Sequence, residues 1–159
     1  MRSIKVVKDK KKAGNDSYAF PWKYDSTCFN FQVPEETLTE EEAEVTGDPL
    51  NVTTAVIADD LDDYSFIRRF KNLKQLYIYR GEKLTDISFI EDLVFLSQIV
   101  VIRSNVESLE PLERLITRKI STLIPYGIEG ICIQSDHELE MDKPRGIHIG
   151  ELIINWRRV

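Results

Sequence analysis

The side chains best suited to catalysis or metal binding lie near the C-terminal end of the sequence. His137 sits in "SDHELE", and His148 follows eleven residues later in "GIHIGE". This spacing matches no familiar set of metal ligands, so we expect no metal site. Cys132 can be drawn with either histidine as a nucleophile and its base, but no third group is placed to order the pair. We therefore predict a protein that is not an enzyme. The alternative is a hydrolase-like enzyme that uses Cys132 with His137 or His148.

Loops that would hold a phosphate or a cofactor are also missing from the sequence. The stretches "YRGEKLTD", "GIEG" and "GIHIG" lack the glycine and lysine pattern of nucleotide-binding loops. The basic run "KDKKK" has no aromatic residues between its lysines, unlike sites for single-stranded nucleic acid, and we interpret it as a solvated loop. We expect neither a cofactor nor a nucleic acid to bind.

The charge of the chain is unevenly placed. The net charge is −6, and no Lys or Arg occurs from Tyr24 to Ile67, a stretch rich in Asp and Glu. This acidic stretch would repel the phosphates of nucleic acid and attract a basic protein partner. The alternative interpretation is a solvated surface with acids at helix N-termini.

Several features predict a cytoplasmic protein. No apolar run approaches the roughly 18 residues that a membrane span requires, and the basic N-terminus has no apolar segment typical of a secretory signal. The two cysteines, Cys28 and Cys132, do not form a disulfide framework. We expect both to be reduced thiols, with a single bridge between them as the alternative.

An internal repeat predicts the architecture that must position these residues. "LDDYSFI" at 61–67 recurs as "LTDISFI" at 84–90, a shift of 23 residues. The same shift aligns an apolar motif, "LKQLYI" at 73–78 with "LSQIVV" at 96–101, and "VTTAVI" at 52–57 and "IEGICI" at 128–133 fit that motif. Its alternating end predicts β-strands. Between the strands, apolar residues every third position predict 3₁₀ turns or short helices with one buried stripe. Asp63 and Asp86 are expected to cap these segments.

Over residues 50–133, this pattern resembles the leucine-rich repeat family, and it is most similar to the bacterial type with short repeats. "LTDISFIEDLVFL" and "VESLEPLERL" are the segments that carry the likeness. The resemblance implies an α/β fold, a short right-handed solenoid with a parallel sheet on its concave side. The family usually has Asn just after each strand, where this chain has Asp60, Gly81 and Ser104, with Asn105 one place late. The turns must therefore be stabilised differently.

The ends of the chain are expected to close such a solenoid within a single domain, 1–159. Residues 1–50 form an N-terminal cap containing β-structure, residues 51–133 form three to four repeats, and residues 134–159 form a C-terminal cap. Strands are predicted at 3–7 and 26–33, and a helix is predicted within 34–45. One or two further strands are predicted in 146–156.

The sheet surface is the predicted site of function. Alternate residues of each strand point away from the core and form neighbouring rows, whose centre is apolar and rich in tyrosine. Leucine-rich repeats mostly present this sheet to another macromolecule, so the resemblance implies a protein–protein interaction module, such as an adaptor or an immunity protein. The predicted contact residues are Val56, Gln75, Tyr77, Tyr79, Gln98, Val100, Ile102 and Cys132.

Two alternatives to an open binding face stand beside this prediction. The N-terminal or C-terminal segment folds over the face and buries it, or the chain forms a homodimer. The homodimer would use either the sheet face or an edge strand at 147–154, because an uncovered edge strand invites pairing.

Overall fold

The computed structural model describes residues 1–12, 34–122 and 127–159. Within these ranges the chain forms strands, two α-helices and short 3₁₀ helices (η). The strands are β1 (Arg2–Val7), β2 (Glu36–Thr39), β3 (Val52–Ile57), β4 (Gln75–Ile78), β5 (Gln98–Ser104), β6 (Ile128–Ser135), β7 (Ile149–Ile154) and β8 (Arg157–Arg158). The helices are α1 (Glu40–Val45), α2 (Glu110–Ser121), η1 (Lys10–Lys12), η2 (Pro49–Asn51), η3 (Ser65–Arg69) and η4 (Ser88–Ile90).

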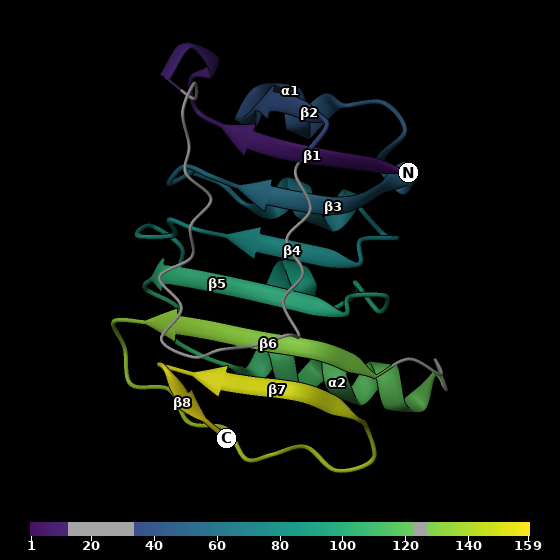
Figure 1. The fold of residues 1–159 in the computed structure, drawn as a ribbon, viewed down its shortest axis with the longest axis vertical. Coiled ribbons are helices and arrows are strands. Elements are labelled where there is room, and N and C mark those ends of the chain that lie inside the picture. The colour runs from purple at the N-terminus through teal and green to yellow at the C-terminus, as the bar shows by residue number, and fades with distance from the viewer. Residues whose placement is uncertain (13–33, 123–126) are drawn as a thin grey trace.

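All of these strands belong to one open sheet in the order β2-β1-β3-β4-β5-β6-β7-β8 (Figure 1). Every neighbouring pair is parallel except β7 and β8, which are antiparallel. The predicted α/β class with a parallel sheet is therefore confirmed. The sheet also extends beyond the repeats, because β1 and β2 continue it at one end and β7 and β8 at the other.

The repeat sets the register of the central strands. Leu76 of β4 lies opposite Ile99 of β5, and Ile99 lies opposite Ile131 of β6. All three are fully buried in one hydrophobic cluster with Leu112 and Leu115 of α2, the helix that lies behind the sheet in Figure 1. The main hydrophobic core is therefore the layer between the sheet and the return segments, as the spacing of apolar residues predicted.

The return segments have the predicted short helical form. The first two are the 3₁₀ helices η3 and η4, and the third is the longer helix α2, which has Pro111 in its first turn. Asp63 and Asp86 each accept the backbone N–H of the serine two residues later, at 2.8 Å in both cases. The aspartates thus accept a backbone N–H at the start of each return, as expected, from the position just before the N-cap residues Tyr64 and Ile87.

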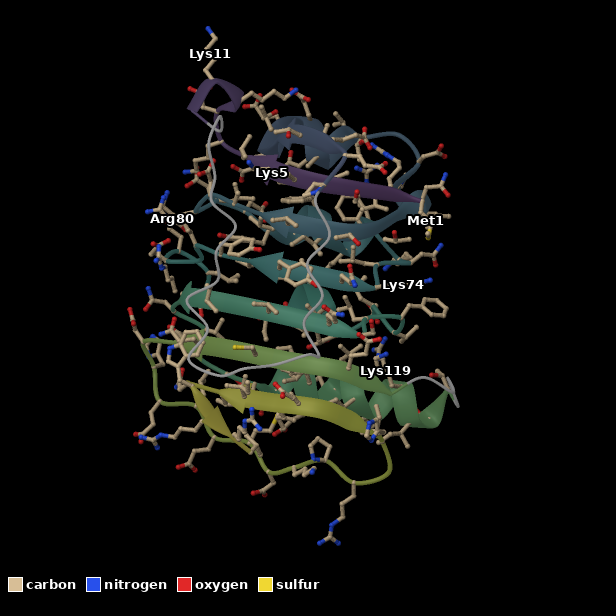
Figure 2. All side chains as sticks on the ribbon, viewed as in Figure 1. Met1, Lys5, Lys11, Lys74, Arg80 and Lys119 are labelled. Carbon is tan, nitrogen blue, oxygen red and sulfur yellow. The ribbon has the colours of Figure 1, made fainter. Side chains whose placement is uncertain are left out.

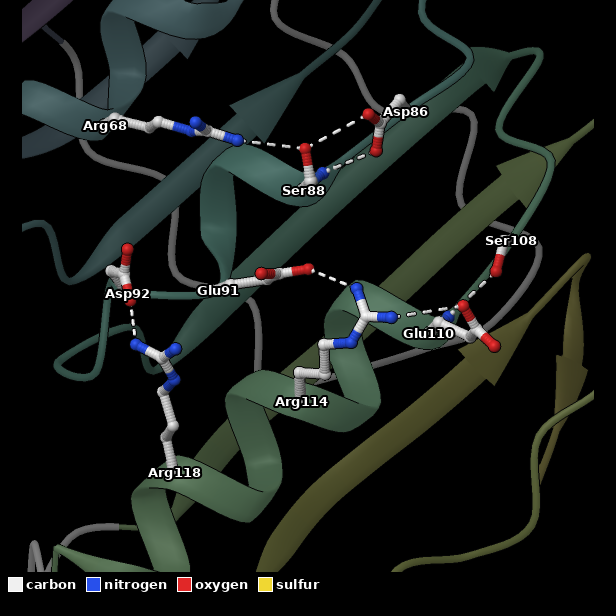
Figure 3. A network of polar contacts seen from close by, with 9 residues as sticks. All are labelled: Arg68, Asp86, Ser88, Glu91, Asp92, Ser108, Glu110, Arg114 and Arg118. Carbon is white, nitrogen blue, oxygen red and sulfur yellow. Dashed lines mark hydrogen bonds and ion pairs between the residues drawn. The ribbon is translucent and has the colours of Figure 1, made fainter.

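Polar side chains connect successive returns on the outer side of this layer (Figure 3). Arg68 of η3 donates to the Ser88 hydroxyl at 3.0 Å. Arg114 of α2 pairs with Glu91 at 2.8 Å, and Arg118 of α2 pairs with Asp92. Each contact links one return to the next, so the returns stack in register with the strands.

The turns at Asp60, Gly81 and Ser104 are held by different groups. Asp60 accepts the backbone N–H of Lys83, one repeat later, at 2.9 Å. The Ser104 hydroxyl donates to the carbonyl of Gln134 at 2.6 Å, while Gly81 donates its own backbone N–H to the carbonyl of Arg103 at 3.2 Å. Different donors and acceptors thus stabilise successive turns.

The N-terminal region differs from the sequence prediction in one respect. Residues 36–39 form the strand β2, and the helix α1 begins only at Glu40. The short run Thr37-Leu38-Thr39 pairs with β1, and the Thr39 hydroxyl then accepts the backbone N–H of Glu42 at 3.2 Å to start the helix. The strand predicted at 26–33, with Cys28, lies outside the described residues.

The C-terminal region forms β7 and a short antiparallel strand, β8. Asn155 and Trp156 connect them with positive φ values of 48° and 65°, which is the conformation of a type I′ hairpin turn. The edge strand expected at 147–154 is therefore partly covered, because β8 pairs with Ile153 and Ile154 of β7.

Candidate functional site

The predicted contact residues lie on the sheet face opposite the helices, and the structure brings them together. Their order across the sheet follows the register, since Val56 lies opposite Tyr77, Tyr77 opposite Val100, and Val100 opposite Cys132. Ile153 of β7 completes this row. With Ile102, Tyr79 and Trp156, these residues form a second hydrophobic cluster.

The face is not open, which corrects the expectation of an exposed apolar surface. Val56, Tyr77, Val100 and Cys132 have no exposed surface, and Ile102 and Gln98 are also buried. Of the eight predicted contact residues, Gln75 and Tyr79 alone are half-buried. The alternation of side chains along a strand predicts on which face of the sheet a residue lies. It does not predict burial, because a buried face and an exposed interaction face can have the same sequence pattern. That any of these residues contacts a partner stays a prediction.

Polar groups within this face are joined to one another. The Tyr77 hydroxyl donates to Oε1 of Gln98, and Nε2 of Gln98 donates to a carboxylate oxygen of Glu129 at 2.7 Å. The Thr54 hydroxyl donates to Oε1 of Gln75 at 3.0 Å. Burial raises the pKa of the Tyr77 phenol above its ordinary value. Hydrogen bonds between buried polar side chains are typical of a protein interior rather than of an exposed ligand-binding surface.

The sheet does not assemble the alternative catalytic pair. Burial, followed by the nearby Glu151, raises the pKa of the Cys132 thiol to about 12, so the thiolate is a minor form near neutral pH. His148 lies beside the start of β6, where its carbonyl accepts the Ile128 N–H, whereas exposed His137 follows the end of β6. Strand residues rise about 3.3 Å each, so the backbone of Cys132, near the middle of β6, lies roughly 13 Å along the strand from the level of His148 and a similar distance from His137, in the opposite direction.

Two lysines are buried in unusual positions (Figure 2). Lys5 of β1 is 4% exposed and lies opposite Val56, in the central row of the sheet face. Lys119 is 2% exposed and occupies the buried stripe of α2 in its last turn. Burial lowers the pKa of Lys119 to about 8, because the interior disfavours its charged form.

The structure brings together acidic residues from two parts of the chain. The Glu40 carboxylate accepts the backbone N–H of Asp63 at 3.0 Å, so the first turn of α1 lies beside the turn that follows β3. We use the term acidic surface for five carboxylates of this region that are half-buried or exposed: Glu40, Glu41, Glu44, Asp48 and Asp63. Lys8, Lys10 and Lys83 pair with the neighbouring acids Glu42 and Asp62. Glu41 and Glu44 form no ion pair within the described residues.

Sequence reasoning missed the apolar side chains beside these acids. Val45, at the end of α1, is 79% exposed, and Leu50, in η2, is 57% exposed. An isolated valine or leucine in a loop carries no signal in the sequence, because its exposure depends on which residues of distant segments pack beneath it.

The described residues contain no group of three or more metal-binding side chains placed to hold an ion. Among the helices in those ranges, none has the length and apolar character to cross a membrane, since α2, the longest, has 12 residues.

The chain matches no known protein-family description, no curated protein and no solved structure.

Proposed function

We propose that this protein is a non-enzymatic protein–protein interaction module and that it binds a basic protein partner through its acidic surface. We further propose that its parallel sheet and stacked returns form a short solenoid of the leucine-rich-repeat type. An adaptor, or an immunity protein that neutralises a basic toxin, would act in this way.

The observation that carries the proposal is the contact between Glu40 and Asp63. It unites carboxylates from α1 and from the turn after β3 into one acidic surface. Concentrated charge of one sign speeds association with an oppositely charged protein and disfavours partners of like charge. The burial of the sheet face that lies away from the helices also favours the acidic surface as the binding site. Most of the predicted contact residues on that face are buried, whereas the carboxylates of the acidic surface are half-buried or exposed.

The solenoid rests on a different argument. The shift of 23 residues that aligns the apolar motifs also describes the register of β4 with β5, where Gln75 lies opposite Gln98 and Tyr77 opposite Val100. A pattern in which each unit packs only on its neighbours is the basis of solenoid proteins.

Affinity capture with charge-reversed variants tests the proposed function. The bait is the purified protein, either unchanged or as Glu41→Lys/Glu44→Lys, and the control is Glu138→Lys/Glu140→Lys, which reverses two exposed acids in the loop after β6. We expect a basic protein to be retained by the unchanged bait and by the control, and lost by the variant in the acidic surface. Equal retention by all three baits would overturn the proposal.

A further inference from the structure

Residues 43–51, which run from the last residues of α1 to the end of η2 and are called the loop below, are held by two arginines that contact them from other elements. Arg69 of η3 donates to the carbonyls of Ala43, Glu44 and Thr46, the last at 2.9 Å. Arg2 of β1 donates to the Thr46 hydroxyl at 2.9 Å and to the carbonyl of Gly47. These contacts fix the main chain of the loop and leave most of its side chains uncommitted.

The loop presents apolar side chains to solvent rather than to the core. Only Ala43 is buried within residues 43–51, while Val45 and Leu50 are the most exposed large apolar side chains among the described residues after Met1. Asn72 holds the Leu50 carbonyl at 2.9 Å, so the backbone at this second apolar residue is fixed as well. A loop that is already ordered loses little conformational entropy when it binds, which favours affinity.

We propose that residues 43–51 are the docking element of the acidic surface, and that Val45 and Leu50 pack against apolar side chains of a protein partner that carries Lys or Arg beside them. The inference rests on the proposed function and names the part of the acidic surface that provides the anchors. Charge identifies the occupant, because Glu41, Glu44 and Asp48 flank the two apolar residues and residues 40–51 contain no basic side chain. A second copy of this chain that docked through the same surface, or an anionic lipid surface, would bring negative charge against these carboxylates.

A defined peptide probe tests the inference before any partner is known. The probe is a short amphipathic peptide of leucine and lysine, with serine–lysine and leucine–glutamate versions of the same length as controls. Titration is followed by amide chemical shifts and by calorimetry. We expect the leucine–lysine peptide to shift the amides of residues 43–51 and to bind more tightly than both controls.

Matched variants locate the binding energy. Val45→Ser/Leu50→Ser should weaken the leucine–lysine peptide about tenfold or more, because two buried aliphatic groups are lost from the complex. Phe95→Ser is the control, since Phe95 is a comparably exposed apolar residue, 46% exposed, in a separate loop, and we expect unchanged affinity. Amide spectra of each variant report whether it is folded.

Three outcomes would overturn the inference. They are equal binding by the serine–lysine peptide, full affinity in Val45→Ser/Leu50→Ser, and shifts confined to other residues. None of these decides the proposed function, because the capture experiment with Glu41→Lys/Glu44→Lys does not depend on the apolar anchors.

Discussion

The Glu40 carboxylate accepts the backbone N–H of Asp63 at 3.0 Å, although 23 residues separate them in the chain. The contact fixes α1 against the turn after β3, and Arg69 of η3 holds the carbonyls at the other end of the same helix. A helix of six residues has little stability of its own, so tertiary contacts of this kind must hold it. The position of the acidic surface therefore depends on the contacts of α1 with the turn after β3 and with η3.

Arg69→Lys is expected to loosen residues 43–48 without unfolding the protein. Lysine keeps the charge but lacks the planar guanidinium that reaches three carbonyls. Amide hydrogen exchange in this segment should become about tenfold faster, whereas exchange in the central strands should not change. Unchanged exchange in residues 43–48 would show that Arg69 does not hold the loop.

Asp63→Ala should lower the free energy of unfolding by about 1 kcal/mol, the usual effect of losing a side-chain cap. Asp63→Asn should retain most of that stability, because an amide oxygen can still accept the Ser65 N–H. Urea unfolding of the two variants measures the difference. Equal stability of Asp63→Ala and the unchanged protein would contradict the capping role.

The same aspartate should contribute to acid sensitivity. The backbone N–H and the hydroxyl of Ser65 lower the pKa of Asp63 from its ordinary value of 3.8. A depressed pKa in the folded state gives stability that is present above the ordinary value and is lost as the pH falls through the lower one. The acid side of the stability curve should therefore be flatter in Asp63→Asn than in the unchanged protein.

The positions of these caps could be read from the sequence, since a repeated aspartate precedes each of the first two returns. The strands and their register were predictable for the same reason: Tyr77 and Val100 occupy equivalent positions in the repeat and lie opposite each other. The burial of Tyr77 was not predictable, because the local pattern does not record what packs on a face. The contacts of Arg2 and Arg69 with residues 43–48 were also hidden, since they join segments far apart in sequence.

Lys119→Met is expected to stabilise the protein. The lysine is 2% exposed, and its pKa falls from 10.5 to about 8 in the folded state. The folded state therefore binds its proton less tightly than the unfolded state, and stability should rise as the pH increases from about 8 toward 10.5. Thermal unfolding across this range should show that rise in the unchanged protein and a weaker rise in Lys119→Met. Lys143→Met, at an exposed position, is the control, and an identical pH profile for both variants would contradict the account.

Cys132 is expected to resist alkylation in the native protein. Its side chain has no exposed surface, and its pKa is raised to about 12, so iodoacetamide lacks both access and a thiolate. Peptide mass spectrometry after labelling distinguishes Cys132 from Cys28. Labelling of Cys132 should require denaturant. Rapid labelling without denaturant would show that the sheet face opens, and would favour the alternative of a hydrolase-like enzyme that uses Cys132.

The affinity of the captured basic partner for the purified protein is the most direct test of the central claim. Calorimetric titration would compare the unchanged protein with Glu41→Gln/Glu44→Gln, which neutralises two exposed carboxylates that form no ion pair within the described residues. We predict affinity that falls as ionic strength rises, with the variant about tenfold weaker at low ionic strength and less sensitive to salt. Equal affinity and equal salt dependence for the two proteins would contradict binding through the acidic surface.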